Sequence, residues 1–246
     1  MSFSPSKYFL TGLLLLVVLA ACKKTSSYNA GVLLYNGSWS LPALSAQWSG
    51  NAIVSGSLAQ GVVSGTADSP YVPVPAGTNL VTIIAGANTL LDKNIYTGTD
   101  TYNSFVVFDT SAVSSSPQVL QLTDDLSIPD TAQLKFRVLH LVPDTIKIDT
   151  WLVNGTSDSL RLDTAGAFIG KDAGAIASGL QTFTSTSFHG GSYSVKVKKS
   201  GTEQLYASLP AQSFLVQGIY TFVFSGQTNG SGAAALKVSV VRSSKF

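Results

Sequence analysis

In its second half the chain reads Tyr193-Ser194-Val195-Lys196-Val197-Lys198, and this stretch decides the fold. Successive side chains of a β-strand point to opposite faces. The tyrosine and the valines therefore share one face, and the lysines lie on the other face. A strand of this kind presents one apolar face to a core and one polar face to water, as the sheets of a β-sandwich require.

Similar short apolar segments recur from Tyr28 onward, and Gly, Pro, Asn or Asp interrupt them roughly every 8–12 positions, which is typical of antiparallel β structure. Long helical periodicity is missing. We predict strands at eight segments rich in Val, Ile, Thr, Phe and Tyr, namely 31–35, 80–84, 104–108, 134–141, 146–153, 193–198, 220–224 and 235–241. The expected fold class is all-β.

Internal similarity indicates that one β unit is duplicated. Matches at three successive shifts support the duplication. Residues 33–35 match residues 138–140, and Gly50 matches Gly155, both at a shift of 105 residues. Residues 76–83 match 190–197 at a shift of 114 residues, and residues 103–108 match 220–225 at a shift of 117 residues. Shifts that grow in order are expected when a duplicated domain gains loop insertions; the alternative is chance matching of common strand residues. We predict a first β-sandwich domain at 28–110, a linker at 111–131 with room for a terminal strand, and a second β-sandwich domain at 132–246.

The first 21 residues have the pattern of a signal peptide. A short segment containing Lys7 precedes the apolar run 10–19, and small residues follow that run. About ten apolar residues are too few to span the roughly 30 Å of a bilayer's hydrocarbon core as a helix. We therefore predict that residues 1–21 direct export and are then removed.

The apolar run ends in Leu19-Ala20-Ala21-Cys22, which resembles the lipobox of bacterial lipoproteins. The resemblance implies that Cys22 becomes a lipidated N-terminus, with residues 22–27 as a polar tether. Each buried methylene contributes about 0.8 kcal/mol, so more than one acyl chain would anchor the protein stably. The residue after Cys22 is not Asp, which by the same resemblance implies the outer membrane and leaves its periplasmic or cell-surface face open. The alternative is a buried cysteine in an ordinary helix.

The amino-acid composition limits the classes of partner that the protein is expected to bind. The 246 residues are 45% hydrophobic and 11% charged, and the formal net charge is +2. Because the basic residues are few and scattered, we expect no nucleic-acid partner. A single cysteine excludes a disulfide framework within the chain, and two histidines without further cysteines argue against a zinc site. We expect no metal and no cofactor.

The second unit carries a family resemblance. It rests on Arg137-Val138-Leu139-His140-Leu141-Val142-Pro143-Asp144, on Asp149, Asn154 and Gly155, and on Gly191, Tyr193, Tyr220, Thr221 and Gly226. These residues resemble the repeat of domain of unknown function 4397, a family common in bacterial lipoproteins and often present in tandem. The resemblance covers most of 132–226, and in the first unit it fits mainly at 74–77. It implies tandem immunoglobulin-like sandwiches and brings no catalytic residues.

Candidates for catalysis are weak. His140 and His189 are the only possible histidine bases, and the chain has no Gly-x-Ser-x-Gly motif. His140 lies within a predicted strand and is expected in the core, whereas His189 precedes two glycines and is expected in a turn. Asp144 follows Pro143, where its carboxylate is expected to accept backbone N–H bonds. We predict that the protein is not an enzyme.

Three tryptophans are candidates for stacking on sugar rings, because an exposed indole offers a flat apolar face. Trp48 and Trp151 stand shortly before Gly50 and Gly155, and both are expected in the core of their units. Trp39 lies in a serine-flanked loop. Trp39 is therefore the candidate glycan contact, and its exposure is the property to test.

Two functional hypotheses follow. The first is a lipid-anchored cell-envelope protein that acts as a non-catalytic binding, adhesion or structural module, with an envelope protein or a glycan as its partner. The second is a glycan-binding accessory lipoprotein that uses loop aromatics. A hydrolase is a more distant alternative, since it would need two carboxylates about 5–10 Å apart in a cleft.

Overall fold

The computed structural model describes residues 30–54, 56–143, 147–155, 158–166 and 183–244. These residues form β-strands, with one short 3₁₀ turn at Gly232–Ala234, so the predicted all-β class is confirmed. Each of the eight predicted strands falls on a strand of the structure. Cys22 and Asp144 lie outside the described residues.

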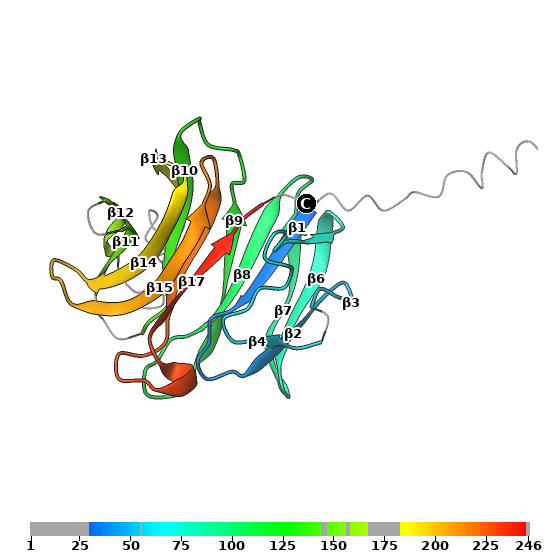
Figure 1. Cartoon of the computed structure of the whole chain (residues 1–246). Coiled ribbons are helices and arrows are strands. Elements are labelled where there is room, and N and C mark those ends of the chain that lie inside the picture. The colour runs from blue at the N-terminus through cyan, green and yellow to red at the C-terminus, as the bar shows by residue number, and fades with distance from the viewer. Residues whose placement is uncertain (1–29, 55, 144–146, 156–157, 167–182, 245–246) are drawn as a thin grey trace, which may run out of the picture.

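The first domain consists of two facing sheets (Figure 1). Its strands are β1 (Ala30–Asn36), β2 (Ala43–Trp48), β3 (Asn51–Ala52), β4 (Leu58–Ala59), β5 (Val72–Val74), β6 (Gly77–Ala85), β7 (Asn88–Thr97), β8 (Tyr102–Asp109) and β9 (Pro117–Asp124). The inner sheet has the order β5-β1-β8-β9, and the outer sheet has the order β3-β2-β6-β7, with β4 also paired to β2. Strand β9 falls within the segment 111–131, so much of that segment is the last strand of the first inner sheet.

The second domain repeats this plan (Figure 1). Its strands are β10 (Gln133–His140), β11 (Ile148–Asn154), β12 (Asp158–Gly166), β13 (Thr184–Ser187), β14 (Gly191–Lys199), β15 (Leu205–Phe214), β16 (Ile219–Ser225) and β17 (Lys237–Arg242). The inner sheet has the order β13-β10-β16-β17, and the outer sheet has the order β12-β11-β14-β15. Strand for strand, both orders match those of the first domain.

Pairing between the named strands is antiparallel in both domains except at one equivalent place. Strand β1 runs parallel to β8, and β10 runs parallel to β16. A parallel pair needs a long crossover connection, and in each domain the strands of the outer sheet supply it. The expected antiparallel structure is therefore confirmed for every other named pair and corrected at these two.

The strand registers test the three sequence shifts. Leu33 pairs with Ser104, and Arg137 pairs with Thr221. Ser104 and Thr221 are 117 residues apart, which is the shift predicted for these two strands. Their pairing partners Leu33 and Arg137 are therefore equivalent. The shift between the first strands of the two domains is thus 104 residues rather than 105. The predicted match of Leu33 with Val138 was therefore one residue out of register, and a slip of one residue exchanges the two faces of a strand.

The four sheets stack as four layers separated by three apolar cores. The first core lies between the sheets of the first domain, and the second core lies between those of the second domain. A middle core joins the two inner sheets through apolar residues of both domains, including Leu33, Val106, Leu122, Leu139 and Val223. The two sandwiches are thus packed against each other along their inner faces.

This stacking explains the apolar runs of the inner strands. In β1, Val32 and Leu34 enter the first core, whereas Leu33 and Tyr35 enter the middle core. Every residue of β1, β8 and β16 is buried. Strands covered on both faces read as continuous apolar segments, whereas an outer strand such as β14 keeps the alternation of valine and lysine.

Candidate functional site

Trp39 lies in the loop after β1 and is half-buried. Its backbone N–H donates to the Asp109 carboxylate at 2.9 Å, and the hydroxyls of Ser38 and Ser40 donate to the same carboxylate at 2.7 and 2.5 Å. The indole Nε1 is covered and has no hydrogen-bond partner among the described residues. Asp109 therefore holds the loop, and Trp39 offers only part of its ring to a ligand.

The other two tryptophans occupy different environments. Trp48 is fully buried in the first core, as expected. Trp151 is half-buried, as Trp39 is, but it lies on the outer face of the second outer sheet, so the expectation that it lies in the core was wrong. The registers give the reason: Trp48 pairs with Val81 and Leu152 pairs with the equivalent Val195, so Leu152 rather than Trp151 takes the core position.

Two cations flank the ring of Trp151. Arg161 lies directly opposite it on β12, with its guanidinium carbon 5.4 Å from the ring centre. The Lys198 ammonium, from β14, lies 5.6 Å from the same centre. Both distances are within the range of cation–π attraction. Because β11 is an interior strand of its sheet, the indole stands on a rigid element.

Two carboxylates complete the cluster. Asp149, two residues before Trp151 on the same strand face, accepts from Arg161 at 2.8 Å and from the backbone N–H of Gly201 at 3.1 Å. Glu203, on the turn that joins β14 to β15, pairs with Lys198. We did not predict this site from the sequence. One signal was available: Asp149 and Trp151 are two residues apart and so share a strand face, and a carboxylate on that face indicates that it is the outer one.

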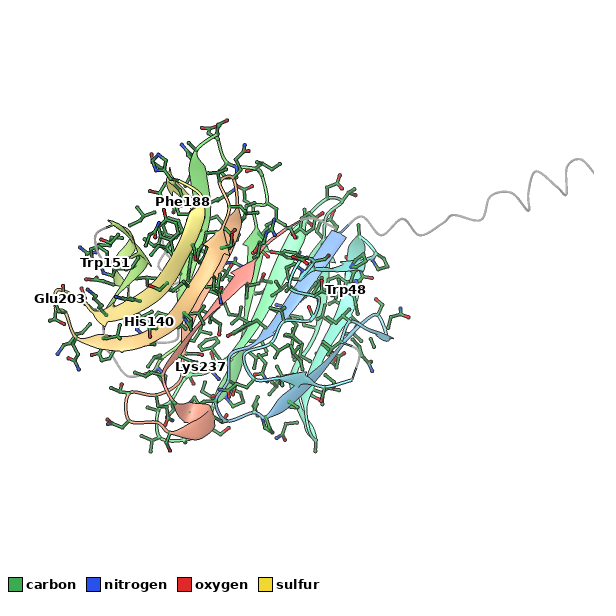
Figure 2. All side chains as sticks on the ribbon, in the orientation of Figure 1. Trp48, His140, Trp151, Phe188, Glu203 and Lys237 are labelled. Carbon is green, nitrogen blue, oxygen red and sulfur yellow. The ribbon has the colours of Figure 1, made fainter. Side chains whose placement is uncertain are left out.

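These groups surround a hollow of about 350 Å³ on the outer sheet, lined by Asp149, Trp151, Arg161, Lys198, Gly201, Thr202 and Glu203. We call it the Trp151 hollow. Figure 2 shows Trp151 and Glu203 close together at the outer side of the second domain. An aromatic face beside fixed donors and acceptors can bind a ligand that has both an apolar face and polar edges, as a sugar ring has.

The two histidines occupy the places expected of them. His140 is buried, packs edge-to-face against Phe224 at 5.4 Å, and accepts a hydrogen bond at Nδ1 from the backbone N–H of Val142. His189 is exposed in the connection between β13 and β14, where its carbonyl accepts from the Tyr193 hydroxyl.

A buried polar cluster joins the two domains. Arg137 of β10 donates to Asp124 of β9, to Ser104 at 3.1 Å and to Thr221 at 2.9 Å. The Tyr71 hydroxyl donates to the same carboxylate at 2.7 Å. Burial raises the pKa of Tyr71 well above its ordinary value, and the negative charge of Asp124 raises it further, so the phenol stays protonated. This cluster is inaccessible to a ligand, and its effect is to fix the orientation of the domains.

A second hollow, of about 440 Å³, lies between residues 61–70 of the first domain and strands β15 and β17. Its lining is mostly apolar and backbone, with Arg242 at one end. Its lining does not combine a partly exposed aromatic ring with paired charges, as the lining of the Trp151 hollow does.

Among the described residues, no group of three or more His, Cys, Asp or Glu is placed to hold a metal ion. Across that same part of the chain, no helix is long and apolar enough to cross a membrane.

Comparison with known families gives one match. Residues 30–151 match the family described as Domain of unknown function (DUF4397), so the chain carries a domain of this family there. The matched range begins with β1, covers the whole first domain and ends at Trp151. The family inferred from sequence is thus supported, although the match lies mainly in the first domain rather than the second. A search of curated proteins found no match to the chain.

Proposed function

We propose that this chain, which carries a DUF4397 domain at residues 30–151, is a lipid-anchored cell-envelope protein that acts as a non-catalytic binding module. Cys22 would hold it at the outer membrane, with residues 22–27 as the polar tether. The observation that carries the proposal is the Trp151 hollow, a partly exposed indole set among paired charges on an interior strand.

The architecture supports a module that presents a surface rather than one that closes around a substrate. Three apolar cores and the Arg137–Asp124 pair hold four sheets together. Binding groups on strands of such a framework are positioned more accurately than groups on loops. The outer sheet of the second domain therefore offers a preformed contact area.

Among the partners considered, the Trp151 hollow favours a glycan over an envelope protein. A sugar ring can stack on an indole while its hydroxyls hydrogen-bond to neighbouring charged side chains. The glycan-binding hypothesis is thus retained, with Trp151 as its principal residue and Trp39 as a second, partly covered contact.

We also propose that the second domain is a further copy of the same family and that both copies are immunoglobulin-like. The shared strand order, including the parallel pair at the same place, supports a common origin. A duplicated module in which only the second copy carries an outer indole would have specialised that copy for binding.

The test is a binding screen of the purified full chain against a panel of soluble oligosaccharides by calorimetry. We expect at least one glycan to bind. The Trp151→Ala variant should lose this binding, whereas the Trp39→Ala variant should keep most of it. Product analysis of the same mixtures by mass spectrometry should find the glycans intact. Cleavage by the pure protein, or binding that does not respond to Trp151→Ala, would refute the proposal.

A further inference from the structure

We infer that the Trp151 hollow binds an acidic glycan, with a uronic acid unit stacked on Trp151 and its carboxylate on Lys198. The inference rests on the proposed function and names the ligand class of that same site. It follows from an asymmetry between the two ion pairs that flank the indole.

The first ion pair belongs to the framework. The Asp149 side chain is only 5% exposed, and it accepts from both Arg161 and the Gly201 backbone N–H. Because Asp149 ties β11 to β12 and to the β14–β15 turn, a ligand could displace it only by breaking several contacts at once. Asp149 therefore positions the Arg161 guanidinium beside the ring of Trp151.

The second ion pair is weakly held. Glu203 is 91% exposed, whereas the Lys198 side chain is 20% exposed. An ion pair with one fully hydrated partner changes an equilibrium by about fivefold at most. Glu203 can therefore swing away into water at little cost, while Lys198, whose side chain is mostly covered, keeps a preference for a negative partner. A ligand carboxylate would take the place that the Glu203 carboxylate occupies in the free protein.

The charges around the indole agree with an anionic ligand. Lys196 lies directly opposite Trp151 on β14 and forms no ion pair among the described residues. Of the cations near Trp151, Arg161 and Lys198 line the hollow, against the carboxylates of Asp149 and Glu203. Once Glu203 turns away, a single fixed carboxylate faces these two cations, and a sugar carboxylate restores the balance. A neutral sugar would stack equally well on the ring but would leave Lys198 without a negatively charged partner.

The experiment uses three pairs of tetrasaccharides that differ only at C6, which is either a hydroxymethyl group or a carboxylate. The pairs are β-1,4-linked glucose and glucuronate, α-1,4-linked galactose and galacturonate, and β-1,4-linked mannose and mannuronate. Affinities are measured by calorimetry on the full chain in detergent. In at least one pair we expect the acid to bind about tenfold more tightly than its neutral counterpart, since charge-assisted hydrogen bonds are the stronger ones. Raising the salt concentration should reduce that preference.

Variants separate the roles of the residues. Lys198→Ala should bring the acidic and neutral affinities close together, and Glu203→Gln should strengthen binding of the acid up to about fivefold by removing the competing carboxylate. Trp151→Ala should weaken both members of a pair, and Trp151→Phe should restore part of the loss. Lys237→Ala, which removes a lysine on β17 away from the hollow, is the matched control and should change neither affinity (Figure 2).

Two results would overturn the inference in different ways. Equal binding of acid and neutral sugar, still dependent on Trp151, would refute the acidic ligand and leave the proposed function standing. No binding of any member of the three pairs, with the unfolding midpoint of the protein normal, would refute the inference, and a wider panel without any binder would refute the proposed function as well.

Discussion

Replacing Asp124 by Asn should strongly destabilise the protein. The Asp124 and Arg137 side chains are 0% and 2% exposed, so neither charge can be hydrated where it stands. Asn keeps the shape and two of the hydrogen bonds but leaves the guanidinium buried without its carboxylate. Removing one partner of a buried ion pair costs about 3–5 kcal/mol, a large part of the roughly 5–15 kcal/mol by which native proteins are stable.

The assay is urea unfolding of the full chain followed by circular dichroism. Because the middle core links the domains, we expect one cooperative transition in the unaltered protein. Asp68→Asn is the matched control: its side chain is 94% exposed and that of its partner Arg242 is 44% exposed, so its loss should cost at most about 1 kcal/mol. The double variant Asp124→Leu with Arg137→Met, which removes both charges, should be more stable than Asp124→Asn alone. A loss below about 1 kcal/mol in Asp124→Asn would show that the ion pair does not hold the domains as argued.

Three further predictions concern other parts of the chain. Cys22→Ser should release the protein from membranes or leave its precursor uncleaved, as fractionation and mass spectrometry would show, and a processed and lipidated Cys22→Ser protein would contradict the anchor. His140→Gln with His189→Gln should leave glycan binding intact while lowering stability by about 1 kcal/mol, nearly all of it from the buried His140; abolished binding in a folded double variant would contradict this. The hydrogen bond from Lys135 lowers the pKa of Asp125 to about 2, so the stability from this pair should be complete above about pH 4 and fall as the pH drops towards 2; a stability difference from Asp125→Asn that persisted at pH 2 would contradict it.

The strands of the inner sheets and of β14 could be predicted because their patterns are local. Continuous apolar runs and strict alternation both follow from which faces of a strand are covered. Strands β7 and β15 were harder to predict. Polar residues interrupt the apolar positions of β7, and β15 contains Pro210, which is tolerated because β15 lies at the edge of its sheet.

The position of Trp151 shows what local pattern leaves undetermined. The sequence repeat placed Trp48 and Trp151 together because both precede a glycine, and both glycines do adopt positive φ. The pairing with the neighbouring strand sets the equivalence instead: Trp48 lies opposite Val81 and Leu152 lies opposite the equivalent Val195, so Trp151 stands one residue before the core position. A displacement of one residue along a strand is enough to exchange the core face for the outer face.

The buried cluster could not be predicted from sequence for a different reason. Arg137 lies 33 residues from Ser104 and 84 residues from Thr221, and no short motif links them. Their meeting depends on the two inner sheets packing face to face. An arginine inside an apolar strand signals that a partner is needed, but the identity of that partner is a property of the tertiary structure.

The central claim is that the Trp151 hollow is the ligand site of this protein, and the crystal structure of its complex with the acidic tetrasaccharide that binds best tests it most directly. We predict a sugar ring lying on the indole of Trp151, its carboxylate within hydrogen-bond distance of the Lys198 ammonium, and Glu203 turned towards solvent. A sugar bound elsewhere, with Trp151 uncovered and Glu203 still paired with Lys198, would contradict the claim.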